Sequence, residues 1–507
     1  MSSSIILPKI NIAPQNRHIK HELRRGAWYS ITALLICIMN IVAQSKTIVL
    51  ATIVVFAFLL IIVFFAGAKQ HILYGLIIYS PFSLRLNLGT NFALSSDLLL
   101  FDLFAILLMI DFIASQKYRI RVQSLASAVV LFTVTLTFLT VASSDIGTSL
   151  RKAFYLVHYL LIFVVITTQV KTEKQVETSL FALISVAGII SLAALAVFMM
   201  QFQPGFDVWH FRNWLPENVI WLLHGQDAAD AAVTSNNWII PLGNVAIFRT
   251  FFPFINPMAL ATYLLLIFPV MLSYIIYNPL LPQPFFFKLN FIVVSATIIL
   301  SFARSVWLGM ILATIITLLG KKAIFKLFIR SFVRLKMPKW FIIAPLLLVV
   351  AIVLMIAVPS LRERLFSIAD MNNASNLDRF YTWQLSWSTF KENPLVGVGL
   401  GVFAEKHYSH NAYLDFAVET GIVGLGLFIF MFIASLGEAI SVRNQAKSNV
   451  MQCMAIGWIA AILGLLVHFF FDNEFFFPQN GVAIIIILAL IKSAYLINYR
   501  NVYAHRN

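Results

Sequence analysis

Long apolar runs recur along this chain, and they constrain its fold more than any other feature. They are roughly 16 to 23 residues long, close to the ~20 residues that an α-helix needs to cross the hydrocarbon of a bilayer. Only 11% of the 507 residues are charged, against about a quarter in a soluble domain. The chain is therefore predicted to be all-α, a polytopic integral membrane protein with about 12–14 transmembrane helices.

We place one membrane-spanning helix on each apolar run. The predicted spans are 27–45, 47–66, 71–87, 98–114, 124–141, 150–168, 178–200, 257–277, 288–303, 305–320, 340–358, 413–436, 451–471 and 480–497. The first apolar run is long enough to span and follows a basic segment, so we expect no cleavable signal peptide. Cys37 and Cys453 both lie in predicted spans, so we expect neither a disulfide nor a cysteine-bound metal.

The basic residues indicate how the spans are oriented. If Arg24 and Arg25 lie inside the cell, alternating spans place most lysines and arginines inside as well, including the dense basic cluster at 321–339. This is the positive-inside pattern of membrane proteins. It accounts for the net charge of +15, so we expect no nucleic-acid partner. Two longer loops, 201–256 and 359–412, then fall on the outer face, and loops of this length are usually functional.

We find no internal repeat, and we expect one membrane domain with two outer insertions. Its predicted segments are a cytoplasmic N-terminal tail (1–26), N-terminal transmembrane helices (27–200), a first outer loop (201–256), transmembrane helices with a basic inner loop (257–358), a second outer loop that carries the catalytic motifs (359–412) and C-terminal transmembrane helices (413–507).

Three arginines on the outer side stand out against the positive-inside trend. Arg249 stands just before a span, Arg304 stands at the outer tip between two short apolar segments, and Arg379 lies in the second outer loop. Each is either a surface residue that reaches lipid headgroups or part of an anion site, because a guanidinium group matches phosphate oxygens. Two or three such groups together would suit a lipid-linked diphosphate.

His410 stands where the second outer loop enters the next span. It is either a hydrogen-bonded interface residue or a general base, because imidazole titrates near neutral pH. Asn411 either caps the helix or orients a substrate. Asp415 and Glu419 lie four residues apart on one helix face. They would pair with an arginine, orient His410 or line an ion path, and we expect the arginine pairing.

Other polar and small residues have simpler interpretations. Gly421 and Gly424 suit close packing between spans. His468, Asp472 and Glu474 form a polar group that we assign to the membrane interface. The first outer loop carries tryptophans that form either an aromatic belt at headgroup level or a sugar-stacking surface: Trp209, Trp214, Trp221 and Trp238.

Three stretches resemble motifs of the O-antigen ligase and polymerase superfamily. The pattern His-Asn, nine residues, Gly, two residues, Gly, which begins at His410, resembles its signature. "SFARSVWLGM" resembles the family's arginine motif at the outer end of a span, although Ala303 stands where many members have Ser and Ser305 follows the arginine instead. "DRFYTWQLSWSTFKENPLVGVGLGVF" resembles the segment with an arginine, an aromatic-rich helix and "GVG". The resemblance covers about residues 245 to 430.

This resemblance implies a metal-independent glycosyltransferase in the bacterial inner membrane, with both termini cytoplasmic and the active site periplasmic. Its donor would be a glycan on an undecaprenyl diphosphate carrier. In the ligases the acceptor is a sugar hydroxyl of lipid A–core, and in the polymerases it is the end of another lipid-linked glycan. The sequence leaves both open.

The resemblance also implies roles for individual residues. Arg304 and Arg379 would stabilise the diphosphate, and His410 would act as base or align the acceptor. Direct attack by the acceptor would invert the anomeric centre. No Asp-x-Asp motif lies on an outer loop, so we expect neither a metal nor another cofactor. The predicted catalytic residues are His410, Arg304 and Arg379, and the predicted substrate-binding residues are Arg249, Asn411 and Asp415.

Two other classes of protein were weighed against the enzyme. A transporter would have broken helices at corresponding positions in two halves and a site near the midplane, whereas the polar candidates here gather at the outer face. A structural scaffold would not need the two arginines and the histidine. The enzyme is the favoured interpretation.

Overall fold

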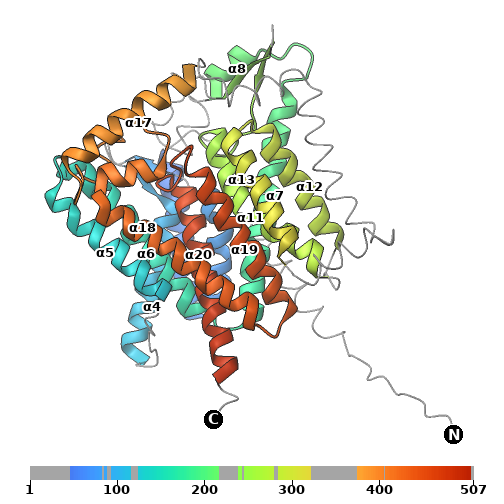
Figure 1. Ribbon diagram of the computed structural model, residues 1–507. Helices are drawn as coiled ribbons and strands as arrows, with labels where there is room; N and C mark the ends of the chain where they lie inside the picture. Colours follow the sequence, from blue (N-terminus) through green and yellow to red (C-terminus); the bar gives the residue numbers. More distant parts are fainter. Residues whose placement is uncertain are drawn as a thin grey trace, which may run out of the picture.

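The computed structural model describes residues 46–82, 85–87, 93–115, 124–215, 238–242, 245–278, 284–320, 374–404 and 406–503, and they form a helical bundle (Figure 1). Its helices are α2 (Lys46–Phe65), α3 (Lys69–Tyr79), α4 (Ser96–Ser115), α5 (Ser124–Leu139), α6 (Ile146–Gln169), α7 (Glu173–Met200), α8 (Val208–Leu215), α11 (Pro257–Tyr277), α12 (Pro284–Leu300), α13 (Arg304–Leu319), α17 (Ala374–Glu392), α18 (Ala412–Gln445), α19 (Asn449–His468) and α20 (Pro478–Tyr503).

Within these described ranges, 7 helices are long and apolar enough to cross a membrane. They are Ser124–Ala142, Ile146–Gln169, Glu173–Met200, Pro257–Tyr277, Ala412–Gln445, Asn449–His468 and Pro478–Arg500. Shorter apolar helices add Ile53–Phe65, Phe285–Leu300 and Arg304–Leu319. The all-α, polytopic fold class is therefore confirmed. The predicted spans 27–45 and 340–358 lie outside the described residues.

The predicted span at 71–87 differs from the structure. Helix α3 ends at Tyr79, and Ser80–Phe82 follow as one 3₁₀ turn. Pro81 lies in that turn, and because proline has no N–H it cannot continue the hydrogen bonding of an α-helix. Strand β1 (Arg85–Asn87) then pairs antiparallel with β2 (Ala93–Ser95).

Polar residues between the apolar runs determine where several helices begin. The Asp145 carboxylate accepts a hydrogen bond from the Thr148 N–H at 3.1 Å and caps α6. Thr172 and Gln175 form a reciprocal capping box at the start of α7. The Asn256 side chain accepts from the Ala259 N–H and so caps α11. Each cap satisfies a backbone N–H that the first helical turn leaves without a partner.

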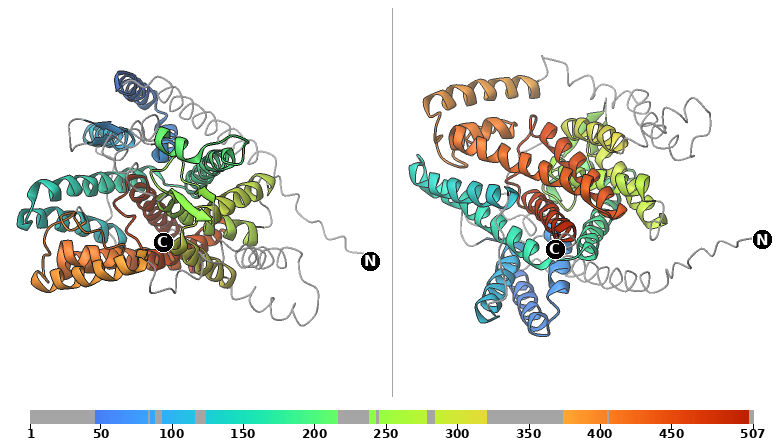
Figure 2. Two further views of the ribbon diagram at one scale, coloured as in Figure 1. Left: turned by 90° about the horizontal axis from the view of Figure 1, so that it is seen from above. Right: turned by 60° about the horizontal axis from the view of Figure 1, so that its bottom comes forward.

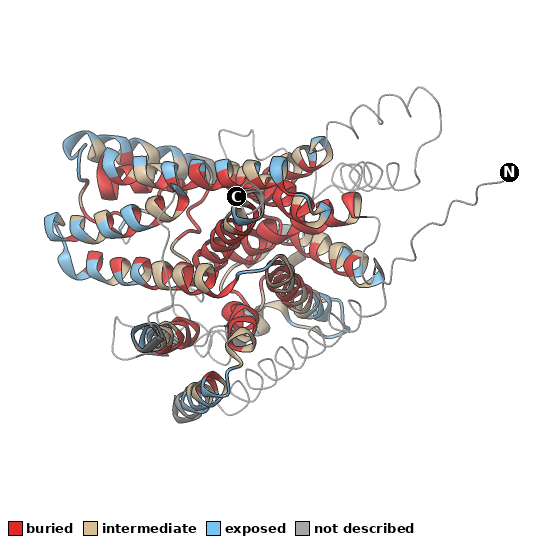
Figure 3. Cartoon of the chain, turned by 90° about the horizontal axis from the view of Figure 1, so that it is seen from below, coloured by how far each residue is buried: buried red, intermediate tan, exposed pale blue. Residues whose placement is uncertain are grey.

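Helix α20 lies inside the bundle, where it packs against α6, α7, α11, α18 and α19 (Figure 2). Of its most apolar window, 89% is buried within the protein. Helices α5, α6 and α18 lie on one side of it, and α11, α12 and α13 lie on the other (Figure 1). Buried residues accordingly gather along the inner helices, and exposed residues lie on the outward faces (Figure 3). The outward faces are largely apolar, as expected for contact with lipid.

Helices α13 and α19 approach each other closely at a pair of glycines. A Cβ atom on Gly309 would lie 2.6 Å from the Gly464 carbonyl oxygen, and one on Gly464 would lie 2.8 Å from the Gly309 oxygen. Small residues of this kind let two membrane helices pack backbone to backbone. This contact fixes the start of α13 relative to the end of α19.

The described parts of the two predicted outer loops lie at one end of the bundle (Figure 1). The first contributes α8 and the antiparallel hairpin of β3 (Ile239–Leu242) and β4 (Val245–Phe248), and the second contributes α17. Figure 1 shows α8 and α17 at the end opposite to the C-terminal end of α20. We call this end the α17 end.

The two tryptophans of the first loop whose side chains are described, Trp214 and Trp238, lie in different environments. Trp238 is buried, stacks on Phe251 with ring centroids 4.9 Å apart, and donates to the Ile255 carbonyl oxygen at 2.7 Å. It is therefore part of the protein core. Trp214 is exposed and stacks on Phe211. The Trp209 side chain and all of Trp221 lie outside the described residues.

Candidate functional site

His410 lies in the turn that leads into α18. Its φ of 54° is left-handed, a conformation that non-glycine residues adopt rarely and mostly where function or packing requires it. Ser409 Oγ accepts from the Asn411 N–H at 3.1 Å and donates to the Asn411 carbonyl oxygen at 2.9 Å. The Asn411 side chain accepts from the Leu414 N–H at 3.1 Å. Asn411 is thus the helix cap, one of its two predicted roles.

A buried carboxylate faces the His410 ring. His410 Nδ1 lies 3.6 Å from Asp472 Oδ1. The same carboxylate oxygen accepts from the Tyr408 hydroxyl at 2.7 Å and from the Asn473 N–H at 2.9 Å. The Tyr408 ring meets His410 edge-on, with centroids 4.7 Å apart. A fixed acid beside one ring nitrogen orients an imidazole and leaves the other nitrogen for proton transfer.

The two acids between α19 and α20 differ in charge state. Burial alone would raise the pKa of Asp472, but the His410 and His468 rings and the Tyr408 hydroxyl hold that pKa below its usual value. Burial, followed by the charge of Asp472, raises the pKa of Glu474 well above its usual value, against the hydrogen bond that Asn480 donates at 3.0 Å. The ionised form is thus favoured at Asp472 and the protonated form at Glu474.

The polar group assigned to the membrane interface is instead buried inside the protein. His468 is fully buried, and only 5% of Asp472 and 1% of Glu474 is exposed. The sequence placed them at the outer end of a span, but it did not show that the turn after α19 folds inward against the His410 turn. Asp472 therefore belongs to the candidate site, together with Tyr408 and Asn473, which sequence reasoning missed.

The outer end of α19 joins the helix of Arg304 to the helix that follows His410. His468 Nδ1 lies 3.0 Å from Ser305 Oγ in the first turn of α13. The next residue, Phe469, accepts a backbone hydrogen bond from Ala412 at 2.9 Å. Arg304 and His410 are thus each tied to the same turn of α19.

Arg304 and Arg249 lie around one turn between α12 and α13. Arg304 is the first residue of α13 and is half-buried. Arg249 is buried, and its Nε donates to the Ser301 carbonyl oxygen at 2.6 Å. Phe302, which lies between Ser301 and Arg304 in this turn, has a left-handed φ of 53°. Such a φ is unusual for a bulky residue. Arg249 therefore braces the turn that presents Arg304.

Arg379 approaches the same region from α17. Its Nε is buried and has no hydrogen-bond partner among the described residues. Its charge is close enough to act on His468. One turn further along, Trp383 Nε1 donates to the Ser409 carbonyl oxygen at 2.9 Å, which fixes α17 against the His410 turn. The α17 helix of Arg379 thus contacts the His410 turn directly, whereas the α13 helix of Arg304 is linked to that turn through the outer end of α19.

Among the described residues, no arginine forms the ion pair that we expected with Asp415 or Glu419. Asp415 is fully buried and accepts from Asn473 Nδ2 at 2.9 Å. Glu419 is buried as well, and its two oxygens accept from the N–H groups of Gly401 at 2.8 Å and Ala404 at 2.9 Å. Within the described residues, a side-chain amide thus bonds to Asp415 and two backbone N–H groups bond to Glu419, in place of the expected cation.

Gly421 is a break in α18, not a packing glycine. Its φ of 65° is left-handed, and the helical hydrogen bonding is interrupted there. The carbonyl oxygens of Val418 and Glu419 accept instead from Val398 at 2.9 Å and Gly399 at 3.0 Å. A Cβ atom on Gly421 would lie 2.1 Å from the Leu395 carbonyl oxygen, so only glycine admits this loop.

Gly424 behaves as predicted. A Cβ atom there would lie 2.8 Å from Leu136 of α5 and 2.0 Å from Thr420 Oγ1. The glycine therefore allows α18 to approach a neighbouring span, which is the usual use of small residues between membrane helices.

Comparison with known protein families assigns the segment that carries this site. Residues 289–429 match the family model described as O-antigen ligase. The match contains Arg304, Arg379 and His410, so the resemblance inferred from the motifs is confirmed. The structure and this match together support a multi-pass membrane protein in which residues 289–429 are similar to the O-antigen ligase family. No curated protein matches the chain.

Proposed function

Starting from the O-antigen ligase domain at residues 289–429, we propose that this protein is a glycosyltransferase. It moves a glycan from an undecaprenyl diphosphate carrier to a sugar hydroxyl of lipid A–core. The reaction takes place at the α17 end of the bundle, which we assign to the periplasmic face of a bacterial inner membrane. Both termini then lie in the cytoplasm, as the distribution of basic residues predicts.

The His410–Asp472 pair is the observation that carries this proposal. The ring is partly accessible, with 33% of the side chain exposed, and its Nδ1 faces a buried acid at 3.6 Å. The acceptor hydroxyl gives its proton to His410 as its oxygen attacks the anomeric carbon. The bond from that carbon to the diphosphate oxygen breaks, and the electron pair leaves with the carrier. Direct displacement of this kind inverts the anomeric centre.

The two arginines stabilise the leaving group. The diphosphate gains negative charge as the bond breaks, and guanidinium groups that are already in place lower the barrier. Arg379 presents a buried Nε–H that has no partner among the described residues, and Arg304 is the first residue of α13. We assign the charge neutralisation to these groups, so the reaction is proposed to need neither a metal nor another cofactor.

The remaining predicted residues receive supporting roles in the proposal. Arg249 braces the turn before Arg304 through Ser301. Asn411 caps α18, and Asp415 holds Asn473. These contacts favour positioning of the site over direct contact with the substrate.

A transfer assay on the purified protein in lipid tests the proposal. Undecaprenyl diphosphate-linked glycan is supplied with lipid A–core, and products are followed for the wild type, for His410→Ala and for His407→Ala. His407 is an exposed histidine three residues earlier, so it is the matched control. We expect transfer to core that disappears in His410→Ala and persists in His407→Ala.

The other outcomes are equally informative. Lengthened donor glycan without transfer to core would make the protein a polymerase. Full activity of His410→Ala would refute the mechanism, and no transfer to either acceptor would refute the proposed function.

A further inference from the structure

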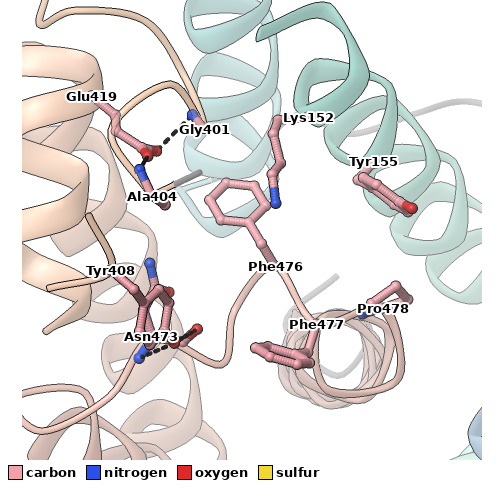
Figure 4. Close-up of a pocket in the computed structure, with 10 residues that line it drawn as sticks. All are labelled: Lys152, Tyr155, Gly401, Ala404, Tyr408, Glu419, Asn473, Phe476, Phe477 and Pro478. Atoms are coloured by element: carbon pink, nitrogen blue, oxygen red, sulfur yellow. Dashed lines mark hydrogen bonds between the residues drawn. The ribbon is translucent and has the colours of Figure 1, made fainter. Parts of the chain in front are cut away.

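The described part of the protein contains a pocket of about 250 Å³, and Figure 4 shows the residues that line it. Three parts of the chain line it: the first turns of α6, residues Gly401, Ala404 and Tyr408 with Glu419, and the turn 473–478. It shares Tyr408 with the candidate site, because that ring lines the pocket and also contacts His410. The pocket therefore lies one aromatic ring away from the proposed base.

One buried polar atom in the pocket wall lacks a partner. Asn473 is only 5% exposed, and its Oδ1 has no hydrogen-bond partner among the described residues. Its other polar groups are occupied, since Nδ2 donates to Asp415 and the backbone N–H donates to Asp472. A buried carbonyl oxygen without a donor is costly. This oxygen is thus suited to a ligand that brings an N–H or O–H group.

Lys152 and Glu419 also line this pocket. The Lys152 stem passes so close to Gly401 that a Cβ atom there would lie 2.6 Å from Lys152 Cγ. Its ammonium group lies 5.5 Å from the centre of the Phe476 ring. Glu419, held by two backbone N–H groups, keeps lone pairs on both oxygens. The pocket wall therefore offers a cationic donor, carboxyl oxygens with free lone pairs and an amide oxygen.

Aromatic rings form the rest of the wall. Tyr155 and Tyr408 lie on different segments, and Phe476 and Phe477 follow one another in the turn before α20. Such a pocket suits a ligand whose apolar C–H faces pack on the aromatic rings and whose hydroxyl groups bond to the polar side chains. The volume is below the ~300–1,000 Å³ that holds a drug-sized ligand, so the pocket suits one such ring.

We infer that this pocket binds a single sugar ring of a glycan substrate. The ring hydroxyls bond to Lys152, Glu419 and Asn473 Oδ1, and the C–H face packs on the aromatic side chains. This inference rests on the proposed function and deepens it, because a ring held here places the next sugar of the same chain near His410. Donor and acceptor glycans both supply such a ring, and the test separates them.

Kinetics of two variants test the inference. Lys152→Gln removes the cation, and Tyr155→Ala removes one aromatic wall. Lys391→Gln is the matched control, since Lys391 is an exposed lysine on α17 that lies over Trp387 and outside the pocket. We expect Lys152→Gln to raise one KM about tenfold, the size expected for the loss of one hydrogen bond to a charged group. Tyr155→Ala should raise the same KM, because it removes an apolar face of the pocket. The control should leave both KM values unchanged.

The substrate whose KM rises identifies the source of the ring. A rise for lipid A–core alone assigns the pocket to the acceptor, and a rise for the undecaprenyl diphosphate-linked glycan alone assigns it to the donor. Unchanged KM values for both substrates, with or without a fall in kcat, would overturn the inference.

A binding measurement separates this inference from the proposed function. Core oligosaccharide released from lipid A, and separately the intact donor, are titrated into wild type and Lys152→Gln in lipid nanodiscs by calorimetry. The wild type could transfer nothing but bind a glycan at least about tenfold more tightly than Lys152→Gln. That result would support glycan binding in the pocket and refute the transferase assignment. If transfer proceeds and the two proteins bind both glycans equally, the pocket assignment fails and the transferase stands.

Discussion

Replacing Asp472 by asparagine removes one charge from the candidate site and little else. Asparagine has nearly the same size, and its Oδ1 can still accept the hydrogen bonds from Tyr408 and from the Asn473 N–H. The change therefore isolates the electrostatic effect of Asp472 on His410. We expect the rate of glycan transfer to fall while the fold is retained.

The size of the effect follows from the geometry. Two unit charges 3.6 Å apart attract by about 4.6 kcal/mol at an effective dielectric constant of 20. Because 33% of the His410 side chain is exposed, water screens part of this attraction, and we keep about half, ~2 kcal/mol. If the imidazolium forms in the transition state, Asp472→Asn slows transfer about 30-fold.

The assay is single-turnover transfer by the wild type, Asp472→Asn, His410→Ala and the double variant. Asp378→Asn, an exposed acid beside Arg379, is the control and should transfer at the wild-type rate. Since Asp472 acts through His410, adding Asp472→Asn to His410→Ala should slow the residual single-turnover transfer little. Equal costs in both backgrounds, or an unchanged rate in Asp472→Asn, would refute the reasoning.

Three further changes probe the donor site, the helix break and the buried acid. Arg379→Lys keeps the charge but loses the planar fork, so KM for the donor should rise about tenfold and further in Arg379→Ala; equal KM values for the lysine variant and the wild type would contradict this role. Gly421→Ala must adopt a left-handed φ, so it should lower the free energy of unfolding by at least about 1–2 kcal/mol. Gly426→Ala, with open space around its Cβ position, should raise it by roughly 0.5–1 kcal/mol; thermal unfolding in detergent compares the two, and similar shifts would argue against the break. Folding raises the pKa of Glu474, so Glu474 destabilises the folded protein at high pH. This destabilisation is absent below the usual glutamate pKa and grows as the pH rises toward the folded value. The gain in Tm from Glu474→Gln should therefore be larger at pH 8 than at pH 5, whereas the exposed control Glu392→Gln should show no such difference; equal gains at both pH values would contradict the raised pKa.

The positions of the helices could be predicted well from the sequence. The predicted span 257–277 coincides with α11, and the spans at 451–471 and 480–497 overlap α19 and α20. Apolar run length and the polar residues between runs are local properties of the chain, and a membrane leaves few alternatives to a helix. The same reasoning placed Arg304, Arg379 and His410 at one end of the bundle.

The partners within the site could not be predicted in this way. Asp472 is far from His410 in the chain, and its burial depends on how the turn after α19 folds. Glu419 is held by backbone N–H groups, which leave no signal in composition. Gly421 looked like a packing glycine because the same residue type serves close packing and a left-handed turn. Such features depend on tertiary contacts rather than on local pattern.

The break at Gly421 divides α18 into two mechanical parts. The short part before it, from Ala412 to Thr420, shares backbone hydrogen bonds with the loop 394–399 and is covalently joined to His410. The long part after it packs in the bundle with α5 and α20. A displacement of the outer loops during substrate entry would therefore move the short part with its loop, and the hinge at Gly421 would absorb the motion before it reached the half of the helix that lies in lipid.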